Sequence, residues 1–153
     1  MTVTSKPQME EFLQGLRGPW GEPETMKIEL GAIRRMALCV EDLDPIHFDA
    51  AAARDRGYRG IVAPWPLLWL VFFNVSDFEI EFPFGKATVH GEDQYEFHEP
   101  IIDGDDITVR TAITQTSVKE GKAGLMGLLV GERRFYNQLG QLCAVLATTA
   151  VRR

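Results

Sequence analysis

The chain has 153 residues, a length typical of one domain that buries a single core without disulfides or a structural metal. Its formal net charge of -6 disfavours nucleic acid and anionic membranes as main partners, because phosphate binding requires a basic surface. The N-terminus lacks the apolar segment of a secretory signal, and the longest apolar run, residues 61–75, is too short to span a bilayer. We therefore expect a single cytoplasmic domain, residues 1–153, that binds neither nucleic acid nor membrane.

The first part of the chain predicts two helices separated by a strand. Apolar side chains spaced by three and four positions predict an N-terminal helical extension at about residues 5–18, which Gly18-Pro19 ends. Alternating apolar residues from Met26 to Leu30 predict a half-buried strand. Helical spacing returns between Ile33 and Val40, so a helix is expected directly before the polar segment that follows.

A short capped helix and a longer apolar helix are predicted next. Asp49 is a suitable N-cap for a helix over residues 50–56, and Gly57 fits the left-handed position at its end. The run from Pro66 to Val75 is almost wholly apolar, which favours a helix enclosed on nearly all sides. Residues 76–86 are expected to form a loop.

The second half of the chain consists of long segments with alternating apolar residues, a pattern typical of an antiparallel meander. In the last segment both alternating faces are apolar, so we expect it to be central or covered on both sides. The fold class predicted from this order is α+β, with a long curved antiparallel sheet wrapped around the central apolar helix. The predicted strands span residues 87–98, 107–118, 123–136 and 141–152.

The polar loop before the capped helix carries the residues best suited to chemistry. Asp42 and His47 lie on either side of Asp44-Pro45, and proline fixes its own φ while biasing the preceding residue away from α geometry. A rigid loop of this kind holds a carboxylate and an imidazole in fixed register. Imidazole exchanges protons near neutral pH, and a neighbouring carboxylate can orient the ring or transfer one of the protons itself. The pair is therefore our candidate for acid–base catalysis.

Several segments of the chain resemble one protein family. The first group is Asp42-x-Asp44-Pro45-Ile46-His47, residues 50–53, Gly57-Tyr58 and residues 60–64. The second group is His90-Gly91-Glu92, residues 95–100, Asp103-Gly104-Asp105 and residues 136–140. With these segments, residues 26–153 resemble the MaoC-like hydratase/dehydratase family, in particular its N-terminal-type branch related to the fatty-acid-synthase dehydratase domain. The resemblance implies the hotdog fold.

The resemblance also implies a reaction. Members of that family add water to, or remove it from, the double bond of an enoyl thioester carried on coenzyme A or an acyl carrier protein. Asp42 and His47 match the family's motif residues, which hold the water and exchange protons with it and with the α carbon. A backbone N–H at the start of the hotdog helix polarises the thioester carbonyl, which places Pro64 and Trp65 at the substrate-binding entrance, with the Trp65 N–H as a possible oxyanion donor. No metal and no organic cofactor is implied, apart from the carrier of the substrate.

Four residues, at three places in the chain, depart from the family's common pattern. Glu41 stands where active members often have glycine, and Asp44 stands where they often have asparagine. Pro64-Trp65 occupies the helix entrance, where they often have histidine and glycine. The bulky indole predicts a reshaped oxyanion site and an aromatic or otherwise unusual acyl group. Trp69, further along the same helix, is predicted to lie in the core.

Two other interpretations stay open. The chain fits a non-catalytic subunit that completes the pocket of a heteromeric hotdog hydratase, and it fits a hotdog enzyme of another reaction type, such as a thioesterase or a biosynthetic cyclase or eliminase. In each case we expect a homodimer or a heteromer with another hotdog subunit, because a single hotdog sheet leaves an edge and apolar area uncovered.

Other residues with suitable chemistry have structural interpretations. Asp44 and Asp49 fit a turn and a helix cap better than they fit metal ligands. Two histidines on predicted strands are expected to make structural hydrogen bonds, His90 and His98. Two cysteines form no metal-binding spacing and are predicted to be buried free thiols, Cys39 and Cys143.

Overall fold

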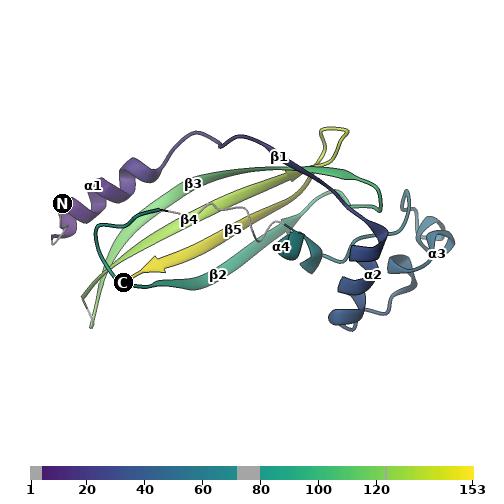
Figure 1. Cartoon of the computed structure of the whole chain (residues 1–153), viewed down its shortest axis with the longest axis horizontal. Helices are drawn as coiled ribbons and strands as arrows, with labels where there is room; N and C mark the ends of the chain where they lie inside the picture. The colour runs from purple at the N-terminus through teal and green to yellow at the C-terminus, as the bar shows by residue number, and fades with distance from the viewer. Residues whose placement is uncertain (1–4, 72–79, 123) are drawn as a thin grey trace.

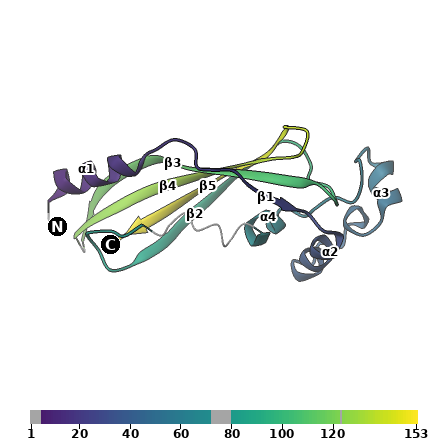
Figure 2. The same ribbon diagram turned by 45° about the horizontal axis from the view of Figure 1, so that its top comes forward.

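The computed structural model describes residues 5–71, 80–122 and 124–153 (Figure 1). Its centre is a five-stranded antiparallel sheet with the strand order β1-β3-β4-β5-β2. Helices α2, α3 and α4 gather at one end of the sheet, and α1 lies at the opposite end beside β3 (Figures 1 and 2). The predicted α+β class is confirmed by this arrangement.

The helices of the described residues are short. They are α1 (Lys6–Leu16), α2 (Leu30–Cys39), α3 (Ala50–Asp55) and α4 (Pro66–Val71), with a 3-10 turn at Pro45–His47. The strands are β1 (Glu24–Lys27), β2 (Thr88–Phe97), β3 (Asp106–Gly121), β4 (Gly124–Tyr136) and β5 (Leu142–Arg152). In the described ranges, no helix has the length and apolar character that a membrane crossing requires.

Helix α1 covers one end of the sheet. The backbone N–H of Ser5, its N-cap, donates to Gln8 Oε1 at 3.3 Å, which is part of a capping box. Met9 and Leu13 face inward, as their spacing predicts. They form a small core cluster with Phe84, Val118 and Leu129.

The strand predicted between Met26 and Leu30 lies earlier in the chain than expected. β1 ends at Lys27 with all of its side chains exposed, and Leu30 already begins α2. The reason is the Glu29 carbonyl, which accepts hydrogen bonds from the N–H groups of residues 32 and 33 and so starts the helix. The predicted helical spacing itself is confirmed, because the inward face of α2 is buried at Ile33 and Ala37.

The sheet is only in part the predicted meander. β3, β4 and β5 follow one another as neighbours, but β2 pairs with β5 and lies at the edge of the sheet instead of beside β3. Every side chain of β2 is exposed or half-buried, whereas buried positions recur along β5. A strand with two apolar faces gains most from a central place. The predicted central position of the last strand is confirmed.

The main core lies where α2 and α4 meet the sheet. Leu67 and Leu68 of α4 are buried there together with Phe135 of β4. Trp69 is 39% exposed instead, and its indole N–H donates to Asp93 Oδ2 at 3.1 Å. The prediction of core burial for Trp69 is wrong, because an indole N–H needs a polar partner and finds one on the edge strand β2.

The helix predicted from Pro66 to Val75 is observed up to Val71. Residues 72–75 of that prediction, and residues 76–79 of the loop predicted after it, lie outside the described residues. Residues 80–86 form neither helix nor strand, as expected of a loop.

The two cysteines differ in exposure. Cys143 is buried, as predicted, but Cys39 is exposed. The buried face of α2 carries Ile33 and Ala37, and residue 39 lies about 200° around the helix from residue 37. The thiol of Cys39 therefore faces away from the core.

Candidate active site

The loop that carries Asp42 and His47 is held by its own polar groups. The Asp44 backbone N–H donates to Asp42 Oδ1 at 3.3 Å, and the Ile46 N–H donates to Asp44 Oδ1 at 3.1 Å. Arg56 Nη1 donates to Asp44 Oδ2 at 2.6 Å, and this bond, with help from the Ile46 N–H, holds the pKa of Asp44 below its usual value. These contacts close a 3-10 turn at Pro45–His47. The loop is therefore held in place, as Pro45 predicts.

The two candidate catalytic side chains are in direct contact. His47 is 5% exposed, and its Nε2 lies 3.1 Å from Asp42 Oδ2. The other ring nitrogen, Nδ1, lies 2.7 Å from the carbonyl oxygen of Val62. Since 46% of the Asp42 side-chain surface is exposed, the pair is buried on the imidazole side and open to solvent on the carboxylate side.

The partners of the ring fix where its protons are. A carbonyl oxygen only accepts hydrogen bonds, so His47 Nδ1 carries a hydrogen and donates it to Val62. A neutral ring then has a lone pair on Nε2, beside the carboxylate of Asp42, and both groups are acceptors. When the ring takes up a proton, Nε2 donates to Asp42 Oδ2. The pair can therefore gain and release one proton at Nε2, which is the capacity that general acid–base catalysis needs.

Pro64 and Trp65 lie directly before α4. The Pro64 carbonyl accepts from the N–H of Leu67 at 3.0 Å, which begins the helix. Trp65 is 57% exposed and lies edge-on to Tyr95, with ring centroids 5.4 Å apart, while Phe97 stacks on Tyr95 at 5.6 Å. Within the described residues, the backbone N–H of Trp65 donates to no acceptor. The entrance to the helix is thus lined with aromatic rings from β2.

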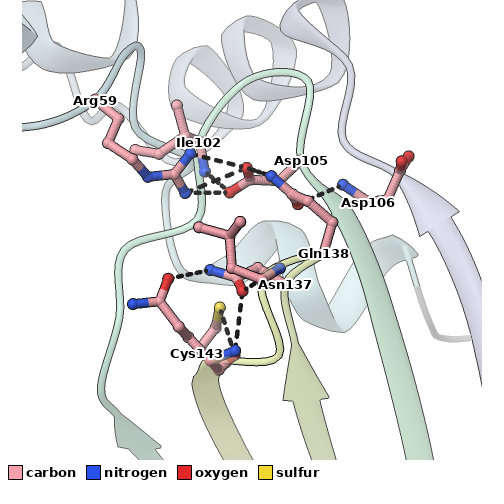
Figure 3. A network of polar contacts seen from close by, with 9 residues as sticks. Arg59, Ile102, Asp105, Asp106, Asn137, Gln138 and Cys143 are labelled. Carbon is pink, nitrogen blue, oxygen red and sulfur yellow. Dashed lines mark hydrogen bonds and ion pairs between the residues drawn. The ribbon is translucent and has the colours of Figure 1, made fainter.

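A buried aspartate holds the segment next to His47. Asp105 is 2% exposed, and Arg59 binds both of its carboxylate oxygens, with Nη2 3.0 Å from Oδ2 (Figure 3). Gln138 Nε2 donates to Oδ1 at 2.9 Å, and the Ile102 backbone N–H donates to Oδ2 at 2.9 Å. Burial alone would raise the pKa of Asp105, but the bonds from Arg59, Gln138 and Ile102 outweigh it and lower the pKa.

Sequence reasoning missed both Val62 and the Arg59–Asp105 pair. The Val62 contact uses a backbone carbonyl, which no side-chain pattern reveals. Arg59 resembled the other arginines of a solvated face, and Asp105 appeared only as part of a turn motif. The sequence held no signal for Asp105, because it stands beside Asp103 and Asp106 in the same turn, and only the structure shows that it is 2% exposed.

The other candidate groups lie away from a shared site. The side chains of His90 and His98 are 51% and 44% exposed, and their nearest carboxylates are Asp93 at 3.3 Å and Glu96 at 3.9 Å. Asp49 caps α3, with Oδ1 accepting from the Ala51 N–H at 2.8 Å, as predicted. In the described parts of the chain, no group of three His, Cys, Asp or Glu side chains is placed to hold a metal ion.

A family model described as the FAS1-like dehydratase domain region matches residues 16–145. The chain belongs to this family. One relative, a UPF0336 protein of Thermobifida fusca, is 30% identical over 97 residues, which cover 60% of this chain and 63% of that protein. The chain therefore spans less than two thirds of the length of this relative.

Solved structures agree with this family assignment. A chain of the HadBC (3R-hydroxyacyl-ACP dehydratase) complex of Mycobacterium tuberculosis is 26% identical, with a TM-score of 0.70, over 89% of this chain and 96% of that one. The R-hydratase PhaJ1 of Pseudomonas aeruginosa gives a TM-score of 0.68 at 20% identity, over 89% and 81% of the two chains. This FAS1-like dehydratase-region protein has the hotdog fold of MaoC-like hydratases and dehydratases, as its sequence predicts.

Proposed function

We propose that the chain hydrates enoyl thioesters, or dehydrates 3-hydroxyacyl thioesters, with Asp42 and His47 as the acid–base pair. The observation that carries this proposal is the double contact of the His47 ring: Nδ1 donates to Val62, which leaves Nε2 to exchange a proton beside Asp42. Membership of a hydratase/dehydratase-type family supports the reaction class. Coenzyme A or an acyl carrier protein carries the acyl group, and the reaction itself uses no further cofactor.

The pair suits a water molecule as its ligand. Asp42 Oδ2 and the unprotonated Nε2 of His47 are both acceptors, so one water can donate an O–H to each. In hydration, the water oxygen bonds to the β carbon while its proton passes to one member of the pair. A proton from the pair then passes to the α carbon, and the enolate returns to the thioester. Dehydration follows the same path backwards.

The developing negative charge on the thioester oxygen needs a donor. We assign this role to the backbone N–H of Trp65, which precedes α4 and donates to no acceptor among the described residues. Pro64 fixes the approach to this amide, and Pro66 has no N–H to add. The rings of Trp65, Tyr95 and Phe97 support an aromatic or bulky acyl group in this region.

The active form is proposed to be a homodimer or a heteromer with a second hotdog subunit. Trp65 and Phe97 are 57% and 55% exposed in the single chain, an unusual amount of aromatic surface for water to cover. The similar HadBC protein is itself a complex of two kinds of subunit. In such an assembly, the second subunit would cover the exposed rings of Trp65 and Phe97 and the solvent-exposed side of Asp42.

The experiment is an assay of the purified chain, alone and with candidate hotdog partners, on short, long and aromatic enoyl-CoA substrates. Loss of the enoyl absorbance with the thioester intact supports hydration, whereas release of free thiol supports a thioesterase. We expect Asp42→Asn and His47→Ala to lower kcat by about a hundredfold or more. Asp49→Asn is the matched control, because asparagine still caps α3 while one negative charge near His47 is lost.

Two results would overturn the assignment of the pair. If Asp42→Asn and His47→Ala leave the activity of a mixed complex unchanged, this chain is the non-catalytic subunit and the partner provides the acid and base. If Asp49→Asn is as damaging as Asp42→Asn, the loss reflects the charge of the loop and not contact with Nε2.

A further inference from the structure

We infer that Arg59 and Asp105 are positioning residues for the proposed reaction: their ion pair holds the Val62 carbonyl against His47 and so selects the ring tautomer with its lone pair on Nε2. The inference rests on the proposed function. Within the part of the chain that the structure describes, neither residue bonds to Asp42 or His47, so any effect on catalysis must pass through the backbone between them.

Two groups compete to decide the tautomer of the His47 ring. The Asp42 carboxylate favours a hydrogen on Nε2, 3.1 Å away, and the Val62 carbonyl favours a hydrogen on Nδ1, 2.7 Å away. In a neutral ring only one nitrogen carries the hydrogen. If the Val62 oxygen moves away, the carboxylate wins, Nε2 becomes a donor, and the site loses the acceptor that takes a proton from water.

Backbone hydrogen bonds hold the Val62 segment on two sides. The Val62 N–H donates to the Ile46 carbonyl at 3.0 Å, so residue 62 contacts the His47 turn with both of its backbone polar groups. On its other side the segment pairs with the chain around Ile102: Val62 and Ile102 form a β-bridge, and the Ala63 N–H donates to the Ile101 carbonyl at 2.8 Å. Residues 61–63 are therefore a strip between the catalytic turn and residues 101–103.

Asp105 joins Arg59, which precedes this strip, to Ile102 in the segment that pairs with the strip (Figure 3). Its Oδ2 accepts the Ile102 N–H at 2.9 Å, and the same carboxylate accepts two nitrogens of Arg59, three residues before Val62. Gly60, between Arg59 and the strip, lies so close that an added Cβ would be 2.9 Å from Ile102 Cγ2. The ion pair thus pulls the strip onto its neighbour with no room between them.

The ion pair is suited to fine positioning because its loss leaves most of the fold in place. Arg59 is 47% exposed at the side chain, and the strip keeps its backbone bonds without it. A displacement of about 1 Å near a reacting group can cost a hundredfold in rate. We therefore expect a defect in kcat, with the fold intact and KM nearly unchanged.

The test is the nitrogen NMR spectrum of His47 in the full chain labelled with ¹⁵N-histidine, combined with kinetics. A ring nitrogen that carries a hydrogen and one that has a lone pair differ in ¹⁵N chemical shift, so the spectrum reports the tautomer directly. We expect Arg59→Gln to shift His47 towards the tautomer with hydrogen on Nε2 and to lower kcat by about tenfold to a hundredfold. Arg59→Lys keeps a positive charge beside Asp105, so it should restore part of the wild-type tautomer and part of kcat.

Arg134→Gln is the matched control, because it breaks another partly exposed arginine–carboxylate pair, that with Glu132, which lies within β4 and not on the catalytic loop or the Val62 strip. It should leave the His47 spectrum unchanged. Gln138→Ala provides a milder test if Arg59→Gln does not fold: it removes one hydrogen bond to Asp105 and leaves the ion pair, so a smaller shift in the same direction is expected.

An unaltered His47 tautomer in folded Arg59→Gln, or in Gln138→Ala when Arg59→Gln does not fold, overturns the inference. An equal shift in Arg134→Gln also overturns it. Failure of the proposed function looks different: the wild-type chain would show no hydration in any complex, while the tautomer would still respond to Arg59→Gln.

Discussion

His47 and Val62 are 15 residues apart in the sequence, and yet a 2.7 Å hydrogen bond joins the Nδ1 of one to the carbonyl oxygen of the other. This bond gives the two ring nitrogens different tasks. Nδ1 is committed to the backbone, and Nε2 is left to face the Asp42 carboxylate. The chemistry proposed for this protein depends on that division.

Substitution of Gly60 tests how tightly the Val62 strip is held. An alanine Cβ at this position would lie 2.9 Å from Ile102 Cγ2, so the strip must shift. We expect Gly60→Ala to lower the free energy of unfolding by about 1–3 kcal/mol, the usual range for overpacking, and to lower kcat as well. Gly15→Ala in α1 is the control, because nothing lies within 4 Å of the added methyl group. It should stabilise the chain by up to about 1 kcal/mol. Denaturant unfolding measures the free energy of unfolding of both variants. Equal stability of Gly60→Ala and the wild type would contradict the tight contact.

The Asp105 carboxylate should give stability a dependence on acid. Its pKa is lower in the folded chain than the usual 3.8, so its contribution is complete above that pH and is lost as the pH falls through the folded value. Asp105→Asn should cost about 1.5–3 kcal/mol at neutral pH, the range for hydrogen bonds to a charged group.

Because asparagine does not titrate, the difference in unfolding free energy between Asp105→Asn and the wild type should shrink as the pH falls below about 3.8. Denaturation curves recorded over a pH series measure it. Asp103→Asn, in the same turn but exposed, should change stability at neutral pH by less than about 0.5 kcal/mol. A difference between Asp105→Asn and the wild type that stays constant with pH would argue against the ionised, hydrogen-bonded state of Asp105.

The two thiols should react at very different rates. Burial raises the pKa of Cys143 to about 11, and Cys39 is exposed on α2. A thiol reagent attacks the thiolate, so at pH 8 we expect one fast-reacting thiol per folded chain and two in denaturant. Cys39→Ser should remove the fast reaction. Two fast thiols in the folded protein would mean that the region around Cys143 opens readily.

Helix α1 should contribute a separable part of the stability. Leu13 is 1% exposed, and Gly127 of β4 lies under it, where a Cβ would come within 3.1 Å of Leu13 Cδ1. Leu13→Ala leaves a cavity there and should cost about 2–5 kcal/mol. The exposed neighbour Gln14 provides the comparison, since Gln14→Ala should stay within about 0.5 kcal/mol of the wild type in thermal or denaturant unfolding. Similar effects of the two substitutions would show that α1 is loosely attached.

What could be predicted from the sequence is mostly local. Asp49 caps α3 and Gly57 ends it with a φ of 87°, because both roles depend on neighbours a few residues away. The contact of Asp42 with His47 could be predicted for the same reason, because the two residues are five positions apart and Pro45 lies between them. The order of the predicted elements gave the α+β class with a curved antiparallel sheet, and the resemblance to a family then implied the hotdog fold.

What the sequence did not predict depends on contacts between distant segments. Trp69 is apolar by composition, but its N–H pairs with Asp93, 24 residues away. Cys39 follows an apolar helix face without belonging to it. The Arg59–Asp105 pair spans 46 residues, and only the folded chain shows which of several arginines meets this carboxylate.

The place of β5 between β4 and β2 has a consequence for the way the protein is made. Thr88 at the start of β2 pairs with Arg152 near the end of β5, so β2 leaves the ribosome long before the strand that will cover it. During that interval its backbone groups and its aromatic side chains meet solvent, chaperones or other nascent chains. Pairing of two strands so far apart in the sequence is expected to be slow.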